Sequence, residues 1–132
     1  MAHDLYTASV SATAGAVRSD DGALELEVRE ATSSQDGSAT NPEQLMAAAL
    51  GSCLLESLKI ATSTTGGSDD GVQVQAQVTL AEAEGAGYSA RYELSVTLPD
   101  AGTDPEAVLQ QALSLCPFTK SIDAGSLDVH LA

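Results

Sequence analysis

The sequence predicts an α+β domain in which helices lie on one side of an antiparallel β-sheet. In two stretches, 72–80 and 88–98, apolar and polar residues alternate on either side of a glycine-containing turn at 85–87, as in a hairpin with one solvated face. Two other stretches carry apolar residues at three- and four-residue spacing, which is typical of helices. The elements follow the order βββ-α-ββ-α-β, and residues 1–132 are expected to form a single domain.

The first third of the chain is expected to form strands. Apolar residues alternate there with more polar neighbours in two runs: Tyr6, Ala8, Val10 and Ala12, then Leu24, Leu26 and Val28. Turn residues separate the strands at Gly15 and at 20–22, and a loop rich in Ser, Gly and Thr follows from 31 to 40.

The first helix is expected to begin at Pro42, which suits the first helical position. Asn41 can cap this helix, and Gln44 can complete a capping box. Few polar residues interrupt the apolar ones before a loop at 64–71, so most of the helix is expected to be buried.

The second helix is expected to begin near Asp104-Pro105-Glu106. It should end at Cys116, because the residue before a proline is disfavoured in the α region. A last short strand is expected at 127–131.

The charge balance argues against some classes of partner. The chain has 19 acidic and 5 basic residues, a formal net charge of -14. Such a surface repels nucleic acid and anionic membranes, whose binding depends on clustered Lys and Arg. The same charge leads to the hypothesis of a host with a salty cytoplasm, where salt screens the self-repulsion.

The sequence favours a cytoplasmic location. Residues 1–4 contain no Lys or Arg and no apolar run follows them, unlike a secretory signal. The longest apolar stretch, 45–55, is too short to span a bilayer. Two cysteines fit a reducing cytosol better than a disulfide framework. Two isolated histidines and two distant cysteines do not form a convincing zinc set, so no metal is expected.

Cys53 and Cys116 are either inert core residues or a redox couple. Cys53 lies about three turns into the first helix, where the helix dipole gives its thiolate little support, so it needs a nearby cation. Cys116 lies at a helix C-terminus, where the dipole disfavours a thiolate. These positions favour Cys53 as the nucleophile and Cys116 as the resolving thiol.

The motifs around the two cysteines point to a known family. The sequence Thr40-Asn41-Pro42-Glu43-Gln44-Leu45, then Cys53, and the pair Cys116-Pro117 after a second helix, resemble the organic hydroperoxide resistance / osmotically inducible protein C family of thiol peroxidases. The resemblance spans nearly the whole chain. It implies a sheet wrapped around two helices in an intertwined dimer. It also implies that Cys53 attacks the hydroperoxide and that Cys116 then forms a disulfide with it.

The resemblance further implies that a Glu and an Arg, bonded to each other, hold the reactive thiolate. Glu43 matches the family Glu, although an acidic residue in a first helical turn is also favoured by the dipole alone. The arginine is Arg18 or Arg29. Arg18 is the nearest substitute for the arginine of a Gly-Gly-Arg loop that is shortened here. Arg29 matches the osmotically inducible branch, as Lys120 does, but strand alternation puts it on a polar face with Glu25 and Glu27.

The favoured function is reduction of organic hydroperoxides to alcohols. By resemblance no cofactor is bound, and an external dithiol of the lipoyl type reopens the disulfide. Four apolar residues are expected to line the substrate pocket: Met46, Leu50, Leu54 and Phe118. The alternative, favoured by the doubtful arginine, is a catalytically weak binding or thiol-sensing protein of the same family.

Helix geometry predicts a dimer in which Glu43 serves the Cys53 of the other chain. Ten residues of one helix separate the two side chains by about 15 Å and turn them onto different faces. Two antiparallel helices about a twofold axis would bring the start of one beside the middle of the other.

Overall fold

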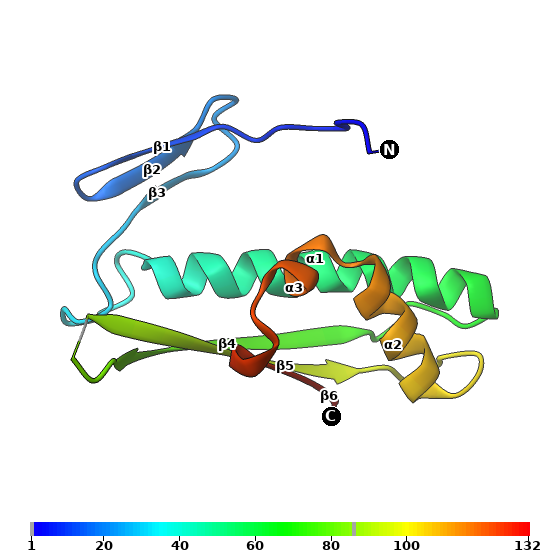
Figure 1. Ribbon diagram of the computed structural model, residues 1–132. Coiled ribbons are helices and arrows are strands. Elements are labelled where there is room, and N and C mark those ends of the chain that lie inside the picture. Colours follow the sequence, from blue (N-terminus) through cyan, green and yellow to red (C-terminus); the bar gives the residue numbers. More distant parts are fainter. Residues whose placement is uncertain (1, 86) are drawn as a thin grey trace. The chain divides into compact units, whose positions relative to one another are not determined.

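The computed structural model describes residues 2–85 and 87–132, so Met1 and Ala86 of the expected turn lie outside the described residues. The elements follow the expected order, with a short helix and a 3-10 turn added before the last strand (Figure 1). They are β1 (Val10–Thr13), β2 (Ala16–Ser19), β3 (Glu25–Glu27), α1 (Pro42–Thr65), β4 (Gln73–Glu82), β5 (Tyr88–Thr97), α2 (Pro105–Leu115), α3 (Pro117–Ser121), η1 (Ala124–Ser126) and β6 (Leu127–Leu131).

The chain divides into two compact units, Met1–Leu45 and Met46–Ala132. The first unit contains an antiparallel sheet with strand order β1-β2-β3. Its β1–β2 turn uses Gly15 at a φ of 91°, a conformation that favours glycine. The apolar side chains of this sheet are poorly covered, since Val10 is 48% and Leu26 41% exposed.

The second unit contains the sheet β4-β5-β6. β4 and β5 form the expected hairpin, in antiparallel register from Gln73↔Thr97 to Glu82↔Tyr88. β6 is parallel to β5, so the expectation of a purely antiparallel sheet is wrong. The helical connection through α2 and α3 is long enough to return the chain in the same direction, which a tight hairpin cannot do. The described strands therefore form two three-stranded sheets rather than one sheet of six.

The core of the second unit lies between α1, β5 and α2. Its completely buried apolar residues are Leu50, Leu54, Leu58 and Ala61 of α1, Leu94 of β5, and Val108, Leu109 and Ala112 of α2. Gly51 faces β4, and a Cβ atom there would make an ordinary van der Waals contact of 3.6 Å with the Cβ of Ala76. Small and aliphatic residues thus fill a core that has few aromatic side chains to use.

The N-terminus of α1 has the expected N-cap but not the expected capping box. The Oδ1 atom of Asn41 accepts a hydrogen bond of 2.8 Å from the N–H of Gln44, which confirms the cap. The side chain of Gln44 instead accepts a hydrogen bond of 2.7 Å from the hydroxyl of Thr40. The expected capping box is therefore replaced by a bond to the residue before the cap.

The burial of α1 is lower than expected. In the single chain its buried residues all lie between Leu50 and Thr62. The turns before Leu50 expose small and apolar side chains, including Met46 at 38% exposure. The expectation of a mostly buried helix is therefore wrong for one chain, because the second unit covers only one face of α1.

α1 also has the length and hydropathy of a membrane span, since it continues past the apolar stretch 45–55 to a total of 24 residues. Core helices of soluble proteins meet the same criterion. Leu50, Leu54 and Leu58 are completely buried in the core of the second unit. We therefore describe α1 as a core helix.

Candidate active site

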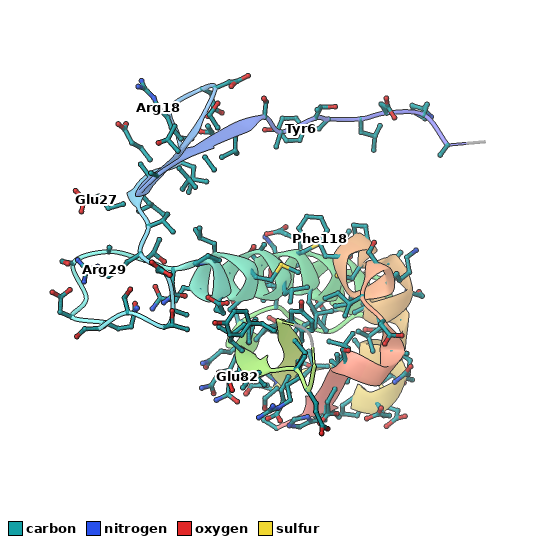
Figure 2. All side chains as sticks on the ribbon, turned by 60° about the vertical axis from the view of Figure 1, so that its left-hand side comes forward. Tyr6, Arg18, Glu27, Arg29, Glu82 and Phe118 are labelled. Carbon is teal, nitrogen blue, oxygen red and sulfur yellow. The ribbon has the colours of Figure 1, made fainter. Side chains whose placement is uncertain are left out.

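The two cysteines meet in the second unit. The sulfur atoms of Cys53 and Cys116, 63 residues apart in sequence, lie 3.6 Å from each other. Both are free thiols, Cys116 completely buried and Cys53 partly exposed. The contact joins the middle of α1 to the junction of α2 and α3, and the N–H of Phe118, a residue that Figure 2 labels, bonds to both thiols. A disulfide between them would require the two sulfur atoms to approach to about 2.05 Å.

Cys116 ends one helix and begins another. Its N–H donates to the carbonyl of Ala112 at the end of α2, and it is the N-cap residue of α3. Cys116 is thus at the C-terminus of α2, as expected, and the sequence analysis did not foresee the short helix α3 that follows it. Burial raises the pKa of Cys116, but the hydroxyl and N–H of Thr119, the thiol of Cys53 and the N–H of Phe118 together lower it below its usual value.

For Cys53 the groups that raise the pKa outweigh those that lower it. Burial raises the pKa of its thiol, the N–H of Phe118 lowers it, and the neighbouring Cys116 raises it again. The net shift is upward. The described surroundings of Cys53 within the second unit therefore do not activate it, which agrees with the expected need for a cation.

Glu43 lies in the first turn of α1, ten residues before Cys53. Its Oε1 atom is buried and has no hydrogen-bond partner among the described residues. A desolvated carboxylate oxygen without a partner is costly in a folded protein. The Oε1 atom of Glu43 could therefore accept a hydrogen bond from a donor that the single chain does not bring to it.

The two candidate arginines differ in what already binds them. The guanidinium of Arg29 donates to the carbonyl of Ser34 (3.1 Å), to Asp36 Oδ1 (3.2 Å) and to the hydroxyl of Ser38 (3.3 Å). The hydroxyl and N–H of Ser38, with Arg29, lower the pKa of Asp36 to about 2. Arg29 therefore holds the loop that follows β3, where Figure 2 labels it.

Arg18 lies on β2, where its register partners are Ser11 and Glu25. Its side chain is exposed, and no hydrogen bond or ion pair of Arg18 occurs among the described residues. Arg18 is thus available to another group, whereas Arg29 is not.

The expected pocket residues are divided between core and surface. Leu50 and Leu54 are completely buried in the core, so they offer no surface to a substrate. Met46 is 38% and Phe118 49% exposed. The sequence predicted all four as pocket residues. Periodicity alone could not show that two of these side chains pack into the core while the other two remain partly exposed.

Thr119 is a site residue that the sequence analysis missed. It is 5% exposed, and its hydroxyl donates to the carbonyl oxygen of Cys116 at 3.4 Å; its hydroxyl and N–H also lower the pKa of Cys116. The available signal was Pro117, which suits the first position of a helix as well as it ends the preceding one.

Comparison with known proteins identifies the class to which this fold and thiol pair belong. A family model described as OsmC-like protein matches residues 35–131. The chain therefore belongs to the OsmC-like family.

The chain is also similar to proteins named for organic hydroperoxide resistance. The chain is 34% identical to the organic hydroperoxide resistance protein OhrA of Bacillus subtilis (strain 168), over 99% of this chain and 97% of that protein. The crystal structure of OhrB of Bacillus subtilis superposes with a TM-score of 0.79 at 30% identity, covering 97% of this chain and 98% of that one. A crystal structure of an organic hydroperoxide resistance protein from Elizabethkingia anophelis gives a TM-score of 0.81 at 29% identity, covering 97% and 95%. The α+β fold expected from the sequence is the fold of these structures.

Proposed function

We propose that this protein is a thiol peroxidase that reduces organic hydroperoxides to alcohols in the cytoplasm. The observation that carries the proposal is the 3.6 Å contact between the sulfur atoms of Cys53 and Cys116. Its relatives bear the name of organic hydroperoxide resistance proteins. A partly exposed Cys53 in contact with the buried Cys116 fits a reactive thiol pair better than two inert core cysteines.

The reaction begins at Cys53, the less buried residue of the two. Its thiolate attacks the outer oxygen of ROOH, the O–O bond breaks, and the alkoxide takes a proton to leave as ROH. Cys53 is then a sulfenic acid. The Cys116 thiolate attacks the Cys53 sulfur, hydroxide leaves and is protonated to water, and a disulfide remains. An external dithiol, of the lipoyl type, reduces the disulfide by exchange and becomes a cyclic disulfide itself.

Activation of Cys53 requires a positive charge, because its own surroundings raise its pKa. We assign this role to Arg18, held by Glu43. The unpartnered Oε1 atom of Glu43 and the availability of the Arg18 guanidinium support the assignment, while the three hydrogen bonds of Arg29 argue against the alternative. A bidentate pair between arginine and carboxylate would satisfy the buried oxygen.

The working unit in this proposal is a homodimer in which Glu43 serves the Cys53 of the other chain. The exposed face of α1 and part of β4 line a groove of about 390 Å³, formed by Ala47, Ala48, Gly51, Ser52, Leu55, Val74 and Ala76. Small residues allow a second helix to approach closely. The poorly covered apolar residues of the β1-β2-β3 sheet also support a partner chain.

The test is consumption of cumene hydroperoxide by the reduced protein, with hydrogen peroxide as the comparison substrate. Apolar surface at Met46 and Phe118 favours the aryl hydroperoxide. Cys53→Ser is expected to abolish turnover, whereas Cys116→Ser is expected to permit one oxidation and then stop. Mass spectrometry of the oxidised wild type should show the Cys53–Cys116 disulfide. Full turnover by Cys53→Ser would overturn the proposal.

The second candidate function is thiol sensing, which the raised pKa of Cys53 favours. The same assay distinguishes a sensor from a peroxidase. A sensor would form the disulfide once per peroxide added but would show no sustained turnover with a dithiol in excess. A peroxidase would turn over until one substrate is exhausted.

A further inference from the structure

The sulfur atoms of Cys53 and Cys116 are spaced so that one soft atom can bond to both. They lie 3.6 Å apart, and both residues are free thiols. Two sulfurs that each bond a shared atom at about 2.3 Å, as in zinc sites, lie about 3.8 Å apart when the angle at that atom is tetrahedral. A linear two-coordinate ion with the same bond length would hold them about 4.6 Å apart. The spacing therefore favours an atom that forms bent, near-tetrahedral bonds to sulfur.

The number of available ligands narrows the choice of atom. Among the described residues, no group of three or more His, Cys, Asp and Glu side chains is arranged to hold a metal ion. A structural zinc site is closed by four protein ligands. A trivalent arsenic atom that carries one carbon substituent is also thiophilic, and it has only two further bonds to make. Two thiols without a third ligand match this atom.

The surroundings of the pair permit an organic arsenical to reach it. Cys53 is partly exposed, so the first bond to arsenic forms there. Cys116 is completely buried, and its sulfur then makes the second bond from within the protein. The side chain of Phe118, whose N–H bonds to both thiols, is 49% exposed and offers an apolar contact to an aryl substituent. An uncharged arsenical is not repelled by the net charge of -14.

We propose that the reduced Cys53–Cys116 pair is a binding site for monosubstituted trivalent arsenicals of the type R–As=O. Two arsenic–sulfur bonds form, the bonds between arsenic and oxygen break, and the two thiol protons leave with the oxygen as water. Arsenic stays trivalent, so the step needs no oxidant or reductant. The occupied pair has no free thiol left for a hydroperoxide, so such compounds would block the proposed peroxidase. The binding itself does not depend on that function.

The probe is phenylarsine oxide, added to wild-type protein that has been reduced and freed of reductant. Mass spectrometry of the intact, folded protein is expected to find one phenylarsenic group per chain, and Ellman's reagent should find both thiols blocked. Dithiothreitol, which binds arsenic through two sulfurs, should remove the group, whereas 2-mercaptoethanol at the same concentration should leave it in place. Two free thiols in the presence of excess phenylarsine oxide would overturn the proposal.

Cys53→Ser and Cys116→Ser are matched variants, because each removes one sulfur and leaves the other. A single thiol makes only one bond to arsenic. The dithiothreitol concentration that removes half of the group should therefore fall by about a hundredfold or more in each variant, because the gain from a second, intramolecular bond is lost. Retention equal to that of the wild type in either variant would overturn the proposal. If Cys116→Ser does not fold, because the residue is completely buried, Cys53→Ser decides alone.

Urea tests whether the folded spacing matters. The unfolded wild type keeps both thiols, but they are then 63 residues apart on a flexible chain. Closing a loop of this length should weaken retention by a factor on the order of a hundred, measured by the same dithiothreitol titration. Equal retention by folded and unfolded protein would overturn the proposal. A wild type that retains the arsenical but consumes no cumene hydroperoxide would support this inference and count against the peroxidase function alone.

Discussion

Arg18 and Arg29 illustrate how the surroundings of a residue decide whether it can serve a site. Both are plausible partners for a thiolate by residue type. Arg29 is bound by three oxygen acceptors within its own loop, whereas the exposed side chain of Arg18 has no such partner among the described residues. Moving Arg29 to a thiolate would require breaking three hydrogen bonds, so Arg18 is the less costly choice.

At the residue scale we predict that Arg18→Ala raises the pKa of Cys53 and slows the peroxide step. A cation beside a thiolate lowers its pKa by roughly one to three units, so removing it moves the pKa up and leaves less thiolate at neutral pH. The pH dependence of Cys53 alkylation by iodoacetamide, measured in Cys116→Ser, reports the change directly.

Arg29→Ala is the matched control. It removes the same charge from the chain and disrupts the loop around Asp36, but should leave the alkylation profile unchanged. A shift in Arg29→Ala without one in Arg18→Ala would transfer the role to Arg29. No shift in either variant would exclude activation by both arginines.

At the scale of elements, helix termini determine the site. α1 begins at Pro42 because Asn41 caps it, and this fixes where Glu43 and Cys53 lie along the helix. α2 ends and α3 begins at the same residue, Cys116, and this places Cys116 at the junction of the two helices, where its sulfur contacts Cys53. A proline at the first position of each of these three helices makes the starts local features of the sequence.

We predict that Asn41→Ala lowers the free energy of unfolding by about 1 kcal/mol, the usual loss when an N-cap side chain is removed. Urea unfolding at a fixed protein concentration measures it. Gln44→Ala is the control, because it removes only an exposed bond to Thr40 and keeps the N–H that Asn41 binds. An equal loss in both variants would contradict the importance of the cap.

At the scale of the whole molecule, a single chain leaves much apolar surface uncovered. Met46 and Ile60 of α1 and Val10 and Leu26 of the first unit are each more than a third exposed. The dimer proposal accounts for this surface and for the unpartnered oxygen of Glu43 together.

Complementation tests the dimer. Glu43→Ala and Cys53→Ser chains, each inactive alone in the proposed mechanism, should regain activity when mixed and refolded together. A heterodimer has one site with both an intact carboxylate and an intact thiol, so about half of its sites should work. A monomeric mass at working concentration would contradict the dimer, as would an absence of recovery when Glu43→Ala alone is inactive.

The net charge of -14 leads to a prediction about salt. Among the described residues, two salt bridges join exposed side chains, and the exposed pair His130–Asp128 is ionic only when the histidine is protonated, so these contacts relieve little of the repulsion between acidic groups. Molar KCl screens that repulsion over distances beyond about 3 Å. The melting temperature should therefore rise with KCl, and a flat or falling melting temperature would count against a salty host.

The sequence by itself determined the features that depend on neighbours a few residues apart. Alternation with period two specified the β4–β5 hairpin, and the residues at 41–42 and 104–105 specified where two helices begin. The motifs around Cys53 and Cys116 were sufficient to indicate the family that the comparisons show. These features can be predicted from the sequence because they depend on local backbone geometry and local hydrogen bonds.

Only the tertiary structure decided how distant segments meet. It made β6 parallel to β5, put Leu50 and Leu54 in the core rather than in a pocket, and bound Arg29 within its loop. It also placed the sulfur of Cys116 at the start of a second helix and against Cys53. Each outcome depends on which surfaces pack together across long stretches of chain, and periodicity along the sequence carries no information about that choice.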